Sequence, residues 1–145
     1  MDKFRVYRIN EQDGNIVAGF EELSIDDLSE GSVVIKVSHS TINYKDALAA
    51  TGTGKILRRY PLVGGIDLAG TVVSSEDDSF EPGAEVLVNG CGLSETCDGG
   101  YAEYARVDSA SVVTVPDGMT PLQTMQIGTA GYTAALAIHR MEQNG

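Results

Sequence analysis

Four neighbouring polar side chains, Asn43-Tyr44-Lys45-Asp46, stand at the mouth of a short helix that the sequence predicts from Asn43 to Ala50. They offer an amide, a phenol, an amine and a carboxylate, which are groups that bind ligands and exchange protons. An asparagine in this place also serves as a helix N-cap, and capping alone is the more common role. The residues by themselves leave both interpretations open.

Two glycine-rich segments could bring the backbone close to a ligand. The first, Gly64-Gly65-Ile66-Asp67, adds a carboxylate, although a turn that leads into a strand explains it equally well. The second, Gly99-Gly100-Tyr101, is typical of a bend that enters a strand. A further loop, Gly52-Thr53-Gly54-Lys55, lacks the preceding strand and the Lys-Ser/Thr dipeptide of a phosphate-binding loop, so we assign it no phosphate.

The elements that must position these groups are mostly short strands. Apolar and polar residues alternate with period two, and Asp13-Gly14-Asn15 is typical of a hairpin turn. Predicted strands cover residues 4–6, 16–20, 33–37, 68–73, 85–88, 101–107 and 112–115. Glycine or proline separates the later strands at intervals suited to a compact β-barrel.

The last part of the chain predicts two helices. Thr120 and Gln123 form a capping-box pattern around Pro121, which begins a short helix. A second helix follows Gly128 and Gly131. Its apolar residues recur every three or four positions and form a face that needs a partner: Ala134, Leu136, Ala137, Ile138 and Met141.

Composition narrows the class of protein. The 145 residues, 42% of them hydrophobic, are enough for one domain with a core. The net charge of -11 argues against nucleic acid or an anionic membrane as partner, because both attract clustered Lys and Arg. No apolar run is long enough to span a membrane, and residues 1–5 lack the apolar core of a signal peptide, so we expect a cytoplasmic protein. Cys91 and Cys97 are too few for a disulfide scaffold and are expected to stay reduced.

The order of the motifs is more specific than any one of them. Asn-Tyr-Lys-Asp at 43–46 is followed by Pro-x-x-Gly-Gly-Ile-Asp-x-Ala-Gly at 61–70 and Pro-Gly-x-Glu-Val at 82–86. Gly-Gly-Tyr-Ala-Glu-Tyr at 99–104 and Ile-Gly-Thr-Ala-Gly-Tyr-Thr-Ala at 127–134 complete the series. This order resembles the medium-chain dehydrogenase/reductase superfamily, and within it the acrylyl-CoA reductase group of the zinc-free quinone oxidoreductase-like branch.

The resemblance implies a mainly β fold with short helices. Residues 1–120 would form a GroES-like catalytic domain, a curved β-barrel without its C-terminal strands, and residues 121–145 the truncated start of a nucleotide-binding Rossmann domain. We therefore expect an N-terminal fragment that is inactive alone. A stand-alone GroES-like binding or assembly module without catalysis is the alternative. A homodimer is expected, since an uncovered apolar face tends to bind a partner.

For the intact family member, the resemblance implies hydride transfer from NADPH to the β-carbon of an enoyl-CoA, or to a quinone or enone. Charge then develops on the carbonyl oxygen, and hydrogen-bond donors must stabilise it in a site without a metal. Tyr44 and Asn43 are the candidate catalytic residues, and the family places this tyrosine beside NADPH. Tyr44, Asn43 and Thr133 are the candidate cofactor-binding residues. The Thr133 hydroxyl bonding its own helix backbone is an equally good interpretation.

Two carboxylates stand close to these candidates in the motifs. Asp46 is expected to orient its neighbours or cap the helix, because an ordinary aspartate is ionised at neutral pH. Asp67 is either structural or part of the site. Zinc-dependent relatives carry a cysteine where this chain has Asn43, and Gly-His-Glu where it has residues 65–67. We therefore expect no zinc.

One departure from the family pattern concerns Cys97, which stands where close relatives commonly carry a histidine. A role of that histidine is not transferred, and we expect the thiol to be inert. Lys55, Arg58 and Arg59 could attract the phosphates of a CoA substrate, although scattered surface charge explains them as well.

Overall fold

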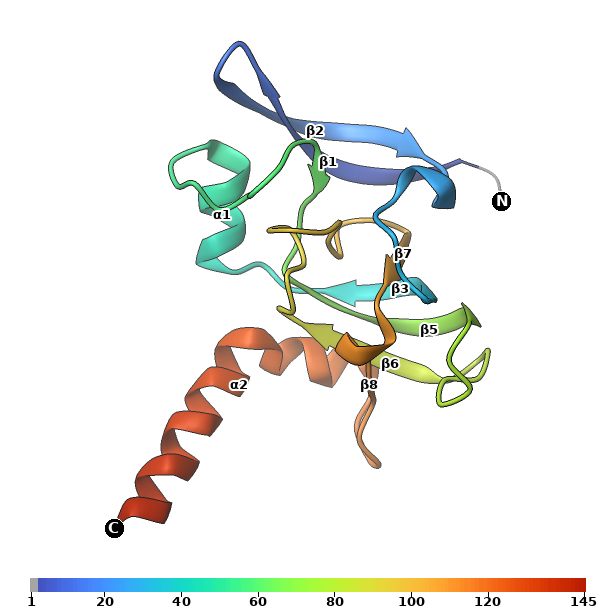
Figure 1. Ribbon diagram of the computed structural model, residues 1–145. Helices are drawn as coiled ribbons and strands as arrows, with labels where there is room; N and C mark the ends of the chain where they lie inside the picture. The colour runs from blue at the N-terminus through green and yellow to red at the C-terminus, as the bar shows by residue number, and fades with distance from the viewer. Residues whose placement is uncertain (1–2) are drawn as a thin grey trace.

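The computed structural model describes residues 3–145, which form two β-sheets and two helices (Figure 1). Met1 and Asp2, with which the expected first domain begins, lie outside the described residues. The strands are β1 (Phe4–Gln12), β2 (Asn15–Leu23), β3 (Val33–Ser40), β4 (Leu62–Val63), β5 (Asp67–Ser75), β6 (Glu85–Asn89), β7 (Tyr104–Val107) and β8 (Val113–Thr114). The helices are α1 (Tyr44–Thr51) and α2 (Pro121–Asn144), and short 3-10 turns lie at Ile25–Asp27 and Ser109–Ser111.

The two sheets together form a curved and open barrel. One has the strand order β2-β1-β4 and the other β7-β3-β5-β6-β8, so neither sheet closes on itself within residues 3–145. Only Tyr104–Val107 of the predicted strand at 101–107 belongs to β7. Residues 101–103 instead bridge the sheets, because the Tyr7 N–H donates to the Tyr101 oxygen and the Val37 N–H to the Glu103 oxygen.

The core follows from the predicted alternation. In β3, Val33 and Ile35 are fully buried while Lys36 faces solvent. The main apolar cluster adds Leu68, Val86 and Val88 from β5 and β6, so the five-stranded sheet carries most of the core. The β1–β2 hairpin turns at Asp13 and Gly14 as predicted, with both residues at positive φ.

α1 lies within one residue of its predicted bounds, and α2 begins at the predicted Pro121. α1 follows Asn43 as N-cap and stops at Gly52 in the left-handed conformation, and Thr120 caps α2. Gly128, with φ 54° and ψ -168°, breaks α2 into the two predicted helical stretches.

The stretch of α2 after Gly128 extends away from the sheets (Figure 1). Its apolar residues Leu136, Ile138 and Met141 are 44%, 58% and 72% exposed, so the predicted apolar face is uncovered. Within residues 3–145, neither helix is long and apolar enough to cross a membrane.

Candidate functional site

The two glycine-rich segments lie face to face and form what we call the glycine seam: Gly64, Gly65, Gly99 and Gly100. The Gly100 N–H donates to the Gly65 oxygen at 2.9 Å, and the Tyr101 N–H donates to the Gly64 oxygen at 2.9 Å. A Cβ on Gly99 would lie 2.2 Å from the Gly65 oxygen. Because no side chain fits between these backbones, the seam requires glycine for close approach.

Tyr101 continues from the seam toward the helix α1. Its ring covers Gly65, where an added Cβ would lie 2.6 Å from Cδ1 of the ring. Its hydroxyl donates to the backbone oxygen of Thr41 at 2.8 Å. Burial, together with the negative charge of Asp46, raises the pKa of Tyr101 far above its ordinary value, so the phenol stays protonated.

A second convergence, the Asp67 junction, consists of Thr41, Asn43, Asp67, Gly128 and Thr129. The fully buried Asp67 carboxylate accepts four hydrogen bonds, from Thr41 Oγ1 at 2.7 Å, Asn43 Nδ2 at 2.9 Å, Thr129 N at 3.1 Å and Thr129 Oγ1 at 2.5 Å. A Cβ on Gly128 would lie only 3.1 Å from Asp67 Oδ2. The junction therefore ties the start of β5 to the residue before α1 and to the break in α2.

Asp46 holds the other side of the Asn43 amide. Its Oδ2 accepts from the Asn43 backbone N–H at 2.8 Å and from Asn43 Nδ2 at 3.2 Å, while its Oδ1 accepts from the Ile66 N–H at 3.0 Å. This geometry confirms the predicted capping and orienting role of Asp46. It also makes both buried carboxylates, Asp46 and Asp67, acceptors for one amide.

The orientation of the Asn43 amide follows from these neighbours. Its nitrogen must face the two carboxylates, because its oxygen would be repelled by them. Asn43 Nδ2 is further shared with Thr41 Oγ1 at 2.7 Å, so its N–H groups are committed to the protein. The capping box of α1 joins the Asn43 side chain to Asp46. An amide oxygen can accept two hydrogen bonds.

The other two predicted site residues are accessible. Tyr44 is the first residue of α1 and is 81% exposed. Thr133 is exposed, and its hydroxyl donates to the Thr129 oxygen at 2.7 Å, which is the bond to its own helix backbone. The junction brings the Asn43 segment and the Thr133 helix together, since Thr129 lies one turn before Thr133.

Sequence reasoning did not identify Thr41 and Thr129 as parts of this site. Thr129 lies inside the motif at 127–134, and its place directly after a glycine that breaks the helix was a usable signal. Thr41 belongs to no motif, and only the folded structure shows that its hydroxyl reaches Asp67.

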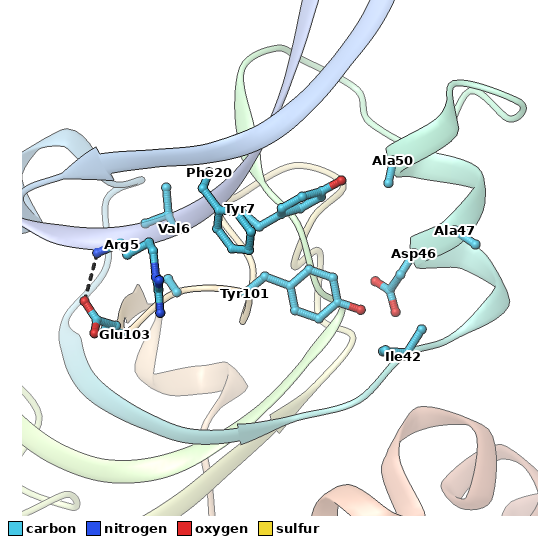
Figure 2. A pocket seen from close by; sticks show the side chains of 11 residues that line it. Arg5, Val6, Tyr7, Phe20, Ile42, Asp46, Ala47, Ala50, Tyr101 and Glu103 are labelled. Atoms are coloured by element: carbon cyan, nitrogen blue, oxygen red, sulfur yellow. Dashed lines mark hydrogen bonds between the residues drawn. The ribbon is translucent and has the colours of Figure 1, made fainter.

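Two hollows lie near this region. The first has a volume of about 480 Å³, and its lining includes Tyr7, Phe20, Ile42, Asp46 and Tyr101. Figure 2 shows the Tyr101 hydroxyl pointing toward Asp46 and Ile42. The second, of about 420 Å³, lies between the sheet and α2, with Asn89, Cys91, Ile127 and Tyr132 among its lining residues. Neither lining includes Asn43, Tyr44 or Thr133, so the predicted site residues lie outside both hollows.

The basic residues of the region are engaged with the protein surface. Lys45 Nζ lies 2.5 Å from Glu95 Oε2, Arg58 Nε lies 3.5 Å from Glu95 Oε1, and Arg59 Nε donates to the Thr96 oxygen at 2.9 Å. The hydrogen bond and charge of Lys45 lower the pKa of Glu95. For Arg58 and Arg59, these contacts favour the interpretation as surface charge.

Both cysteines are free thiols, and burial together with the charge of Asp98 raises the pKa of Cys97, which agrees with an inert thiol. Asp98 itself is buried and accepts from the Val63 N–H at 2.7 Å and the Ser29 N–H at 2.7 Å, a structural role that the sequence did not indicate. Among residues 3–145, no three His, Cys, Asp or Glu side chains are grouped so that they could hold a metal ion.

Comparison with known proteins gives consistent matches. The "Probable acrylyl-CoA reductase AcuI" of Escherichia coli is 47% identical over 137 residues, which cover 94% of this chain and 42% of that protein. The crystal structure of the yhdH oxidoreductase from Salmonella enterica in complex with NADP superposes with a TM-score of 0.93 at 45% identity, over 96% of this chain and 43% of that one. The Bacillus subtilis protein yhfP with NAD bound gives a TM-score of 0.96 at 43% identity, over 100% of this chain and 44% of that one.

The chain thus spans less than half the length of these relatives. The name of the Escherichia coli relative agrees with the group that the order of motifs predicts. Residues 29–117 match the family described as the alcohol dehydrogenase GroES-like domain. The chain therefore belongs to the alcohol dehydrogenase GroES-like domain family.

Proposed function

We propose that this chain is the N-terminal catalytic-domain portion of an NADPH-dependent reductase of enoyl-CoA thioesters, with an acrylyl-CoA-like substrate. Residues 1–120 are its GroES-like domain, and residues 121–145 begin its nucleotide-binding domain. The Asp67 junction is the observation that carries this proposal, because one buried carboxylate holds the 43–46 and 127–134 motifs together. The name of the Escherichia coli relative supports the substrate class, and the NADP of the Salmonella structure supports the cofactor.

Asn43 at the junction, with Tyr44 and Thr133 close to the junction along the chain, fits the nicotinamide end of the cofactor. Tyr44 and Thr133 are exposed, and the oxygen of the Asn43 amide is a hydrogen-bond acceptor. A carboxamide is neutral and donates N–H groups, so it matches an amide oxygen. A phosphate would be repelled by the carboxylates of Asp46 and Asp67. When bound, NADPH supplies the hydride for the β-carbon of the thioester.

Tyr44 is the proposed catalytic donor. Its exposed hydroxyl can donate a hydrogen bond to the carbonyl oxygen on which charge develops, whereas the N–H groups of Asn43 are held by protein acceptors. Asn43 therefore acts through its oxygen and orients the cofactor. Thr133 lies in the stretch of α2 that follows the junction and is proposed as a further cofactor contact.

NADPH binding by fluorescence titration tests the proposal, on this chain and on the longer gene product in parallel. We expect tight binding and enoyl-CoA-dependent NADPH consumption only with the longer protein. Comparable binding by the 145-residue chain would contradict the fragment assignment, and a longer protein that leaves enoyl-CoA unreduced would contradict the substrate class. Competition with NADH decides the cofactor, since the Bacillus relative was solved with NAD.

The role of Tyr44 has its own test in the longer protein. Tyr44→Phe removes only the hydroxyl and is expected to lower kcat about 100-fold, the cost of one oxyanion donor. Tyr104→Phe in β7 is the matched control and is expected to leave kcat unchanged. Equal kcat values for the two variants would assign the donor to another residue.

The uncovered apolar face of α2 favours one alternative, a non-catalytic module that binds a second copy of itself. We propose that the longer enzyme is a homodimer in the cytoplasm, works without zinc and has no nucleic-acid or membrane partner. Sedimentation equilibrium of this chain and of Leu136→Lys separates the cases. Dimerisation of the 145-residue chain that Leu136→Lys abolishes would support the module, while a monomer would support the fragment.

A quinone is the alternative substrate. It is tested by quinone-dependent NADPH consumption with the longer protein.

A further inference from the structure

We propose that Asp67 is a positioning residue, which fixes the direction in which the second helical stretch of α2 leaves the sheets. Through that direction it sets the separation between Asn43 and Thr133. The proposal rests on the proposed function only for what Asn43 and Thr133 bind. The direction of the helix is a property of this chain itself.

The helix begins anew at the junction. Gly128 has a backbone conformation that is essentially restricted to glycine, so the hydrogen-bond ladder of α2 is interrupted there. The Thr129 N–H therefore opens the second stretch and donates to Asp67 Oδ2 at 3.1 Å, and the Thr129 hydroxyl donates to Asp67 Oδ1 at 2.5 Å. A negative charge at this end also complements the helix dipole.

Asp67 is itself held in place from the sheet. It is the first residue of β5, pairs with Asn89 of β6, and accepts the Ser40 hydroxyl on its backbone oxygen at 2.6 Å. Its carboxylate accepts four hydrogen bonds, three on Oδ2 and one on Oδ1, and all four donor groups are neutral. Asp67 Oδ2 receives both Asn43 Nδ2 and the Thr129 N–H, so a single atom relates the two motif segments.

Apolar packing does not hold the second stretch. The buried residues of α2 are Thr124, Met125 and Gly128, and all three precede or form the break. Beyond the break, Leu136 and Met141 are exposed. Among residues 129–144 only Tyr132, which is 53% exposed, lines the hollow beside the sheet, so the hydrogen bonds to the buried Asp67 are the main contacts that set the direction of the helix.

Spin-label distances in this chain measure that direction without any cofactor. One label is placed through Glu142→Cys at the end of α2 and one through Glu85→Cys on β6, since both positions are exposed. Cys91→Ser and Cys97→Ser remove the native thiols. Double electron–electron resonance then gives the distance distribution between sheet and helix end. Because no cofactor is present, the result does not depend on whether the protein reduces an enoyl-CoA.

Thr129→Val and Asp67→Asn are the test variants, and Thr124→Val on the first stretch is the matched control. We expect each test variant to broaden the distance distribution at least twofold, Thr129→Ser to restore the narrow one, and Thr124→Val to match the parent. If Asp67→Asn does not fold, Thr129→Val and Thr129→Ser decide alone. Parental widths in folded Thr129→Val and Asp67→Asn would overturn the proposal, because a merely stabilising carboxylate would change the melting temperature and not the width.

Discussion

The glycine seam and the Asp67 junction both join distant segments, but they use opposite means. The seam brings residues 64–65 against residues 99–100 by having no side chains, so backbone meets backbone. The junction fills its space with a carboxylate that accepts four hydrogen bonds. The contrast teaches that close backbone packing holds the scaffold, while hydrogen bonds to a buried carboxylate position the candidate site segments.

The two regions are also continuous along the chain. Residues 64–67 pass from the seam to Asp67, so the backbone that is immobilised by close packing carries the carboxylate. A variant in the seam should therefore damage the whole fold. A variant in the junction should act mainly on the helix that it positions.

Gly99→Ala should have the largest effect. Its Cβ would lie 2.2 Å from the Gly65 oxygen and 2.4 Å from the Gly64 oxygen, and neither backbone atom can move aside cheaply. We expect a loss of about 3 kcal/mol or more in the free energy of unfolding, measured by urea titration. Gly19→Ala has open space around it and is the control. Similar midpoints for both variants would show that the seam tolerates side chains.

Asp67→Asn should cost less, about 2 kcal/mol in the free energy of unfolding. The amide of the variant would place its NH2 group against N–H and O–H donors that the carboxylate accepts, so hydrogen bonds would be lost. The loss should be concentrated at the junction. Hydrogen exchange is expected to accelerate at the Thr129 amide while amides of β3 and β5 keep their relative protection. A uniform acceleration in all strands would place Asp67 with the seam as a general scaffold residue.

Local signals predicted most of the elements that form these regions. The N-cap role of Asn43 and the capping box of Thr120 were both predicted from nearest neighbours, and the structure confirms them. The sequence also indicated the break at Gly128, since glycine pairs interrupt helices. Turns and helix ends are determined by a few adjacent residues, so they can be predicted from a single sequence.

The contact between distant motifs could not be predicted in the same way. Asp67 meets Thr129 across 62 residues, and the sequence does not state that distance. Each glycine pair was explained alone as a turn, although the two pairs pack against each other in the structure. The two-residue strand β4 was missed, because two residues are too few for an alternating pattern to appear. Long-range packing, and not local propensity, decided these features.

Tyr101→Phe sharpens the comparison, because Tyr101 contacts the seam with its ring and the Thr41 carbonyl beside the junction with its hydroxyl. At neutral pH we expect a loss of about 1 kcal/mol from the unpaired Thr41 oxygen. The pKa of Tyr101 is raised on folding, so its contribution is complete below the unfolded value of 10.0 and is lost as pH rises above it.

The stability difference between wild type and Tyr101→Phe should therefore shrink in alkaline solution. Urea midpoints measured across the alkaline range check this trend. A difference that stays constant with pH would mean that the phenol ionises as easily in the folded chain as in the unfolded one.

Glu95→Gln should have the smallest effect, about 0.5 kcal/mol at neutral pH, because the Lys45–Glu95 pair is partly exposed and screened by solvent. This pair joins α1, beside the junction, to the loop that leads into the seam. Lys45 lowers the pKa of Glu95 on folding, so the contribution is present above the unfolded value of 4.5 and is lost as pH falls through the folded pKa. Wild type and Glu95→Gln should thus converge in acid and in high salt, as measured by thermal melts. A loss of stability as large as that of Asp67→Asn would mean that surface charge, rather than the buried carboxylates Asp46 and Asp67, holds α1 against the seam.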